Sequence, residues 1–318
     1  MFVRTSVASQ LIQYALPSFL GDLPINPQPR APADEANYDR ALTFRATYPL
    51  LDLVVSQSGC RNSALSIAAD VTIEDLAFAK SVRGMILQHA PSPITDVALR
   101  TMNGTLRGLG NPPSTPYRTA LTWVGGHIPS LAALVPTPPA SIPEYMADLV
   151  AFMRRDDVPE TVSSALIYYQ LLTVHPFKDG NGRLARVLTA LRSYQRQASL
   201  SNGLIVAAGL NAIKDCIAAC FESVFDGEAG DYLALWHELE IWAESVAEFS
   251  VRSLRQMHDT LRQRLASTSW GGAYASRIEL TPILSRAELK SIIRGSDKLV
   301  ERYIASLQDG QVLTRREK

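Results

Sequence analysis

The residues best suited to chemistry lie in one run of twelve, from His175 to Arg186, which reads HPFKDGNGRLAR. The imidazole of His175 titrates near neutral pH and could take a proton from a hydroxyl group. Asp179 is the single carboxylate of the run, and it offers the oxygen ligands that Mg²⁺ takes from proteins beside phosphates. A base and a metal ligand so close together favour chemistry on a phosphate compound.

The glycines of this run predict an anion-binding loop. Gly180 and Gly182 can adopt backbone conformations closed to other residues, so successive N–H groups can turn inward. From Arg183 onward, apolar residues recur with the spacing of one helical face: Leu184, Val187, Leu188 and Leu191. A helix that begins at the loop would add free N–H groups and partial positive charge. Arg183 and Arg186 would flank this terminus with groups suited to phosphate oxygens.

Each of these features also has an ordinary structural explanation. A single His before Pro often only ends a helix, two arginines often form a solvated face, and paired glycines often form a turn. Phe177 is expected to anchor the loop in the core in either case. The pattern GxxxxGK[ST] does not occur, which argues against a P-loop NTPase.

The run resembles the signature of the Fic family, HxF-x-DGNGR-x-x-R. Eight positions match: His175, Phe177, Asp179, Gly180, Asn181, Gly182, Arg183 and Arg186. The resemblance implies a protein adenylyltransferase, which moves AMP from ATP to a Ser, Thr or Tyr hydroxyl of a protein. It assigns His175 as the general base, Asp179 as the Mg²⁺ ligand and the other six to the ATP site. The related Doc kinases carry Lys in place of Gly182, so this chain is closer to the nucleotidyl transferases.

The resemblance extends upstream of the loop. Residues 104–139 contain five glycines, seven prolines and the β-prone piece Leu121-Thr122-Trp123-Val124. In the family this region is a hairpin flap that holds the target protein as an added strand. The matching flap residues here are Arg118, Thr122, Trp123, Val124, Gly125 and Gly126. The alternative is that Trp123 and Val124 merely cover the core.

Helical periodicity dominates the rest of the chain. It predicts helices over residues 37–55, 72–89, 142–153, 160–174 and 231–265. The expected fold class is all-α: a Fic-type helical bundle with a short β-hairpin flap, followed by a small winged-helix-like domain. The expected divisions are an N-terminal extension over residues 1–44, the Fic core over 45–265 and the C-terminal module over 273–318.

The C-terminal module has the least decisive pattern. Two helical stretches open at Ser285 and Ser296, each a good helix cap, and residues 309–313 then turn toward a strand. This order resembles the winged-helix module that often follows Fic cores. Residues 277–318 hold nine basic and six acidic side chains, an excess too small to predict DNA binding. A docking or dimerisation role fits equally well.

Composition limits the class of protein. The chain has 318 residues, 47% of them hydrophobic, and a formal net charge of zero. It therefore offers no global electrostatic attraction for nucleic acid or an anionic membrane. No apolar run approaches the roughly 18 residues of a membrane span, and no signal peptide is evident, so a cytoplasmic protein is expected. With three cysteines, a disulfide framework is not expected, and Cys216 and Cys220 are predicted to be buried thiols.

An inhibitory element of the family is missing. Many Fic proteins carry a helix with the pattern [S/T]xxxE[G/N], whose Glu pairs with the second signature arginine, here Arg186. No such pattern occurs in this chain, and the best placement by position puts Ile67 where the Glu would stand. The enzyme is therefore expected to be uninhibited, or to be restrained by a separate antitoxin-like partner or by a different acidic residue. A homodimer is a further expectation.

A second class of function stays open from the sequence alone. The core could serve as a scaffold in a regulatory protein whose C-terminal module binds DNA or a partner protein. Transfer of a nucleotide other than AMP is also open, because the signature does not contain the residues that recognise the base. The intact set of base, carboxylate and arginines favours the enzyme, since a scaffold has no need of them together.

Overall fold

A computed structural model describes residues 2–7, 10–15, 20, 73–108, 114–197, 200–266, 269–271, 273–274 and 286–309. The chain divides into two compact units. Described residues up to Val246 belong to the first unit and those from Ala247 onward to the second. The family-based boundaries at residues 45, 265 and 273 remain predictions, and the predicted helix over 37–55 lies outside the described residues.

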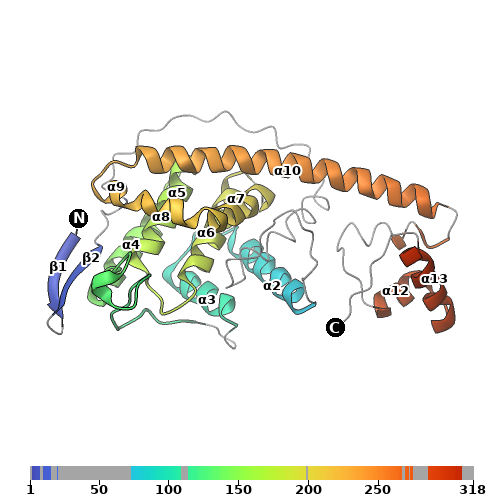
Figure 1. Cartoon of the computed structure of the whole chain (residues 1–318), viewed down its shortest axis with the longest axis horizontal. Helices are drawn as coiled ribbons and strands as arrows, with labels where there is room; N and C mark the ends of the chain where they lie inside the picture. Colours follow the sequence, from blue (N-terminus) through green and yellow to red (C-terminus); the bar gives the residue numbers. More distant parts are fainter. Residues whose placement is uncertain are drawn as a thin grey trace. The chain divides into compact units, whose positions relative to one another are not determined.

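The first unit is mostly helical, as predicted (Figure 1). Its helices are α2 (Ile73–His89), α3 (Asp96–Leu106), α4 (Ile142–Phe152), α5 (Glu160–Val174), α6 (Asn181–Gln197), α7 (Leu200–Ala212), α8 (Lys214–Ala219) and α9 (Phe221–Phe225). Short 3-10 turns, η1 (Pro129–Leu131) and η2 (Pro139–Ser141), precede α4. The long helix α10 (Gly230–Leu265) closes the unit and continues beyond it, close to the predicted span.

Helices α5 and α6 form the centre of this unit. Helix α6 contacts α2, α3, α5 and α7, and α5 contacts α4 as well. Most of α5 is buried, including its polar residues Ser163, Ser164 and Gln170. An aromatic cluster joins α5 to the helices that follow: Tyr168, Tyr169, Phe221, Phe225, Tyr232 and Trp236. Each large apolar side chain buried here stabilises the fold by about 1.5–3 kcal/mol, so the two helices that flank the signature loop lie on a rigid base.

The N-terminal residues form a small sheet that the sequence did not predict. Strands β1 (Phe2–Val7) and β2 (Gln10–Ala15) pair antiparallel, from Phe2↔Ala15 to Val7↔Gln10. Strand β2 lies beside η1. Leu20 is fully buried, and its backbone N–H donates to Asp148 Oδ2 on α4 at 2.8 Å. The start of the chain is thereby fastened to the first unit.

The predicted flap hairpin is present only as one bridged pair. Val124 and Leu134 exchange both backbone hydrogen bonds, at 2.9 and 3.2 Å. Gly125 and Gly126 turn the chain back with φ of 71° and 70°. A Cβ on Gly126 would lie 2.4 Å from the carbonyl oxygen of Leu131, so this close approach requires glycine. Since η1 occupies the chain between the paired residues, no longer strand develops among residues 114–141.

The second unit contains α12 (Arg286–Ile293) and α13 (Asp297–Asp309), both near their predicted positions. They pack with the end of α10 in one cluster: Leu265, Trp270, Tyr274, Leu289, Ile293 and Val300. Ion pairs Arg286–Glu301 and Lys290–Asp297, at 2.9 and 2.8 Å, join the two helices. Helix α13 continues to Asp309, and the predicted strand beyond it lies outside the described residues, so the winged-helix module remains a prediction.

The cysteines differ from the expectation. Cys216 is exposed, Cys220 is partly buried, and both are free thiols. Helix α8 has only six residues, and it turns Ile217 rather than its neighbour Cys216 toward the core. Among the described helices, none has the length and apolar character needed to cross a membrane.

Candidate active site

The predicted base lies where α5 ends. His175 is the C-terminal cap of α5, with φ 49° and ψ 58°, and its backbone N–H donates to the carbonyl of Leu171 at 3.0 Å. A left-handed conformation is uncommon for a residue other than glycine and is often found at functional sites. Pro176 follows and cannot extend the helix. The backbone therefore leaves α5 at His175 and enters the signature loop.

Arg118 holds this helix end in place. Its Nε donates to the carbonyl of His175 at 2.7 Å, and its Nη2 donates to the carbonyls of Val174, at 3.2 Å, and Thr137. Its own backbone N–H donates to the carbonyl of Pro176 at 2.8 Å. The side chain is buried and satisfies carbonyls that a helix end leaves open. Arg118 was predicted to belong to the docking flap. Its buried side chain instead binds the backbone at His175 and so holds the predicted base in position.

The His175 imidazole has one nitrogen committed and one available. Its Nδ1 lies 3.3 Å from the carbonyl oxygen of Leu172. Since a carbonyl only accepts, this bond requires the proton on Nδ1 and leaves the lone pair on Nε2. Burial lowers the pKa of His175 to about 4, with Arg118 acting in the same direction and the Leu172 bond and Asp179 opposing it. The ring is therefore neutral at pH 7, with Nε2 able to accept a proton.

Asn181 sets the shape of the loop. Its Oδ1 accepts from the backbone N–H of Phe177 at 3.0 Å, and its Nδ2 donates to the carbonyl of Phe177 at 2.7 Å. The Phe177 ring is fully buried and lies 5.4 Å from the ring of Tyr117, as expected for a core anchor. Both ends of the Asn181 amide are used inside the loop. Its backbone N–H and the second hydrogen of Nδ2 remain for the phosphate contact assigned by resemblance.

Gly180 allows helix α3 to approach the loop. Its φ is 85°, and a Cβ there would lie 2.7 Å from Asn103 Nδ2 and 3.4 Å from Arg107 Cγ. Asn103 Nδ2 also donates to the carbonyl of Asp179 at 3.0 Å. The conformation and the close contact both require glycine. Gly182 lies in the first turn of α6, where a Cβ would be 3.4 Å from Arg186 Nη1.

The start of α6 presents free donors. The carbonyl of Gly180 accepts the first helical hydrogen bond, from Leu184 N–H at 2.9 Å. Among the described residues, the backbone N–H groups of Asn181, Gly182 and Arg183 have no acceptor. Three such donors at the positive end of a helix dipole form a ready site for an anion.

Asp179 lies between two guanidinium groups. Its Oδ2 is 2.9 Å from Arg183 Nη2 and 3.8 Å from Arg107 Nε, while its Oδ1 accepts from the Gly180 N–H at 2.6 Å. Arg183 also donates through Nη1 to the carbonyl of Leu106 at 2.7 Å. The Asp179 side chain is 53% exposed, so it is open to a ligand that arrives from solvent.

Arg186 lies deeper in the site. It is buried, and desolvation lowers its pKa, while the neighbouring Tyr168 opposes the shift and Arg183 adds to it. A guanidinium stays charged under these conditions. The structure therefore places a buried cation one turn into α6, behind the free N–H groups of its first turn.

The loop offers too few oxygen ligands to hold a magnesium ion by itself, so a bound Mg²⁺ would also need phosphate ligands. No group of three or more His, Cys, Asp or Glu side chains comes together in the described part of the chain. Asp179 is therefore the single carboxylate of the loop that could bind the metal. Mg²⁺ is commonly held by one or two carboxylates together with substrate phosphates and water, and Asp179 meets that requirement.

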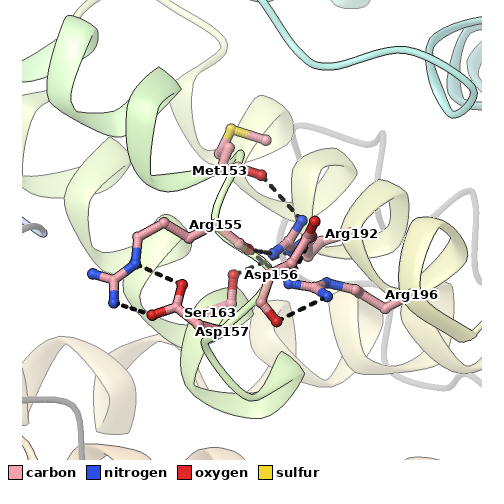
Figure 2. A network of polar contacts seen from close by, with 7 residues as sticks. All are labelled: Met153, Arg155, Asp156, Asp157, Ser163, Arg192 and Arg196. Carbon is pink, nitrogen blue, oxygen red and sulfur yellow. Dashed lines mark hydrogen bonds and ion pairs between the residues drawn. The ribbon is translucent and has the colours of Figure 1, made fainter.

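A second polar network fixes α6 against the turn between α4 and α5, as Figure 2 shows. Arg192 donates to the carbonyls of Met153, at 3.0 Å, and Arg155, at 2.8 Å, and to Ser163 Oγ at 3.1 Å. Burial, aided by the nearby Arg196, lowers the pKa of Arg192 to about 10. Arg192 thus caps the end of α4 and joins it to α5 and α6.

Arg196 extends this network along α6 (Figure 2). It donates to the carbonyl of Arg155 at 2.6 Å and forms an ion pair with Asp156 at 3.2 Å. At the outer edge, Arg155 pairs with both carboxylate oxygens of Asp157, at 3.0 and 2.6 Å. The network determines how α6, and therefore its N-terminus, is set against α5 and His175.

Residues 93–192, which include the whole loop, match the family model described as Fic/DOC family. This chain carries a Fic/DOC family domain. A probable protein adenylyltransferase of Aquifex aeolicus (strain VF5) is 36% identical to it over 58 residues, 18% of this chain and 18% of that protein. The match thus spans less than a fifth of the relative.

Two solved structures resemble this chain. A Fic family protein from Desulfovibrio desulfuricans G20 is 16% identical, with a TM-score of 0.50 over 87% of this chain and 83% of that one. A Fic domain containing signaling protein from Bacteroides thetaiotaomicron VPI-5482 is 18% identical, with a TM-score of 0.43 over 67% of this chain and 86% of that one. The first of these likenesses shows the fold.

Proposed function

We propose that the Fic domain transfers AMP from Mg–ATP to a Ser, Thr or Tyr hydroxyl of a target protein. The observation that carries this proposal is the form of His175, neutral with its lone pair on Nε2, on the same short loop as the free N–H groups of α6. The name of the Aquifex relative, a probable protein adenylyltransferase, supports the same reaction.

In the proposed step, the hydroxyl oxygen of the target attacks the α-phosphorus of ATP. The new phosphorus–oxygen bond forms as the bond to the β-phosphate oxygen breaks, and pyrophosphate leaves. The hydroxyl proton passes to His175 Nε2, which can accept it because the ring is neutral. No covalent enzyme intermediate is needed, since transfer of this kind depends mostly on positioning and electrostatic stabilisation.

The other residues of the loop would bind the phosphates and the metal ion. The N–H groups of Asn181, Gly182 and Arg183 would bind phosphate oxygens, and Arg186 would neutralise charge from behind the helix terminus. Asp179 would hold Mg²⁺, which when bound screens the charge of the leaving pyrophosphate. Arg183 would share the phosphates only in part, because it already binds Asp179 and Leu106.

The bridged pair at Val124 indicates how a target could dock. Both backbone groups of Val124 face Leu134, so in an antiparallel arrangement those of its neighbours Trp123 and Gly125 face the opposite side. The side chains of Trp123 and Val124 are 38% and 40% exposed. An extended segment of the target would add along this free edge and present its hydroxyl to His175.

The test is transfer of labelled nucleotide to protein. Purified protein, Mg²⁺ and a cell lysate would be incubated with ATP labelled at the α-phosphate and, separately, at the γ-phosphate. Transfer of the α-label alone is expected, whereas transfer of the γ-label would show a kinase. Parallel reactions with UTP, GTP and CTP would identify the nucleotide. A protein that transfers no label from any of the four would refute the proposal.

A further inference from the structure

A cation outside the signature also lies at the candidate site. Arg107 caps the C-terminal end of α3, where its backbone N–H donates to the carbonyls of Asn103, at 3.1 Å, and Gly104, at 3.2 Å. Its Nε is 3.8 Å from Asp179 Oδ2, and its side chain is 25% exposed. Its Cγ and Cδ lie against Gly180, at 3.4 and 3.6 Å from the position a Cβ would take. Arg107 is therefore packed on the loop.

Arg107 and Arg183 differ in how much of the guanidinium group is already used. Arg183 is 11% exposed, and two of its nitrogens bind protein oxygens, those of Leu106 and Asp179, at 2.7 and 2.9 Å. The one ion pair that Arg107 forms within the described part of the chain is the long contact through Nε. Among the described residues, no acceptor lies within hydrogen-bond distance of either of its Nη atoms. With respect to the residues that the structure describes, its terminal amino groups are therefore available to a ligand.

The charges favour an anion with several negative oxygens. The guanidinium groups of Arg107 and Arg183 lie beside the carboxylate of Asp179, and Arg183 is close enough to Arg186 to lower its pKa, so the site carries net positive charge. Nearby positive charge opposes the binding of a bare divalent cation to Asp179 and favours a triphosphate. Guanidinium donors suit phosphate oxygens in geometry as well as charge.

We propose that Arg107 is a phosphate-binding residue of this site. When the nucleotide arrives, its guanidinium group leaves Asp179 and binds a phosphate oxygen, which removes one of the two cations beside Oδ2 of Asp179. The long Arg107–Asp179 contact makes this exchange easy, because partly exposed ion pairs contribute little. The inference rests on the proposed function, since it requires a nucleotide triphosphate, and it adds a binding residue supplied by a different helix.

The test compares the binding of ATP and of adenosine, without Mg²⁺, by isothermal titration calorimetry. Arg107→Ala should weaken ATP binding about tenfold or more, because a charge-assisted hydrogen bond is lost. Arg107→Lys should retain part of the affinity, and adenosine should bind all variants equally. The control is Arg286→Ala, which removes an exposed arginine paired with Glu301 in the second unit and should bind ATP like the wild type. In the transfer assay, KM for ATP should rise more than kcat falls.

Three results would count against the inference. Arg107→Ala that binds ATP within about twofold of the wild type would show that Arg107 does not bind phosphate. Equal loss of ATP and adenosine binding, with an unchanged circular dichroism spectrum, would show that Arg107 only shapes the loop. A wild-type protein that binds no ATP would overturn the proposed function and the inference together, whereas the first two results would leave the proposed function standing.

Discussion

At the scale of single residues, several side chains of the site bind backbone groups of the loop itself rather than pointing toward a ligand. Arg118 and Asn181 bind backbone groups of the loop, and His175 is kept neutral by burial. The ligand is left with backbone N–H groups, the Nε2 lone pair of His175 and part of the arginines. Substitutions should therefore separate into those that change chemistry and those that change the shape of the loop.

Replacing His175 with Ala should lower transfer by at least about 10²-fold, because general-base catalysis typically contributes 10²–10⁴. ATP binding should be nearly unchanged, since the imidazole does not take part in the phosphate site. Transfer would be measured with α-labelled ATP and binding by calorimetry. An unchanged rate would remove His175 from the mechanism.

The pH dependence should reflect the buried environment of His175. Burial lowers the pKa of His175 in the folded protein to about 4, from an ordinary value near 6.5, so the neutral and active form persists as the pH falls. We expect kcat/KM to show no loss centred near pH 6.5. The unfolded chain takes up this proton first, so the histidine's contribution to stability should decrease between pH 6.5 and 4. An activity loss centred near pH 6.5 would contradict the burial of the ring.

At the scale of helices, the site depends on the angle at which α6 meets α5. The loop spans only the residues between the end of α5 and the start of α6, so a small movement of either helix displaces the base from the anion site. Arg192 and Arg196 oppose such movement through the turn between α4 and α5 (Figure 2). This network lies at the other end of α6 from its N-terminus, yet it should affect activity.

Replacing Arg192 with Met should lower stability by about 2–4 kcal/mol, since it leaves buried carbonyls without their donor. Activity should fall at temperatures where the protein is still folded. Thermal unfolding by circular dichroism would measure the first effect. Arg155→Ala is the matched control, because it removes the exposed pair with Asp157 and a distant contact with the Phe152 ring but leaves the Arg155 carbonyl in place, and its melting temperature should stay near that of the wild type. Equal melting of all three proteins would show that the network is not structural.

At the scale of the whole molecule, the absence of the inhibitory Glu predicts how the proposed transfer activity is regulated. The position expected to hold an inhibitory Glu contains Ile67, which lies outside the described residues. An Ile cannot compete with phosphate for Arg186. The isolated chain should therefore modify itself or a target without an activating mutation, unless a separate partner is present.

Substitution of Ile67→Glu together with Ala68→Gly should reduce transfer if that segment packs against the site as it does in the family. The measurement is transfer of the α-label by wild type and double variant at equal protein concentration. Ile67→Gln with the same glycine is the control, since it has the shape without the charge. A wild type that stays inactive until a distant acidic residue is mutated would place the inhibition elsewhere in the chain.

Much of the first unit could be predicted because its strongest signals are local. Helix α5 follows an uninterrupted apolar pattern, and α6 follows a loop with a recognisable signature. Helix α3 was missed, and its interior contains Asn103 and Gly104, residues that are poor helix formers. The small sheet of β1 and β2 was missed because Ala8-Ser9, which joins the strands, is not a typical turn sequence.

The site was predicted less completely, because its supporting contacts join distant parts of the chain. Arg107 reaches Asp179 from another helix, and Arg118 reaches His175 across 57 residues, distances that no spacing rule covers. Arg107 follows Asn103 by one helical turn, and this spacing was the only sequence signal for a shared face. The role of Asn181 was local, but its place in the signature suggested a ligand contact rather than a bond to Phe177.

The two hydrogen bonds between Asn181 and Phe177 should also affect the rate of amide hydrogen exchange in the loop. One of them gives the backbone N–H of Phe177 a buried acceptor, the side-chain oxygen of Asn181. Its hydrogen should therefore exchange with solvent as slowly as the amides of α5, with or without nucleotide. The amides of Asn181, Gly182 and Arg183 should exchange rapidly in the free protein and slow down only when a ligand occupies them. The loop would then hold, four residues apart, a protected amide at Phe177 and an amide at Asn181 that reports the arrival of ATP.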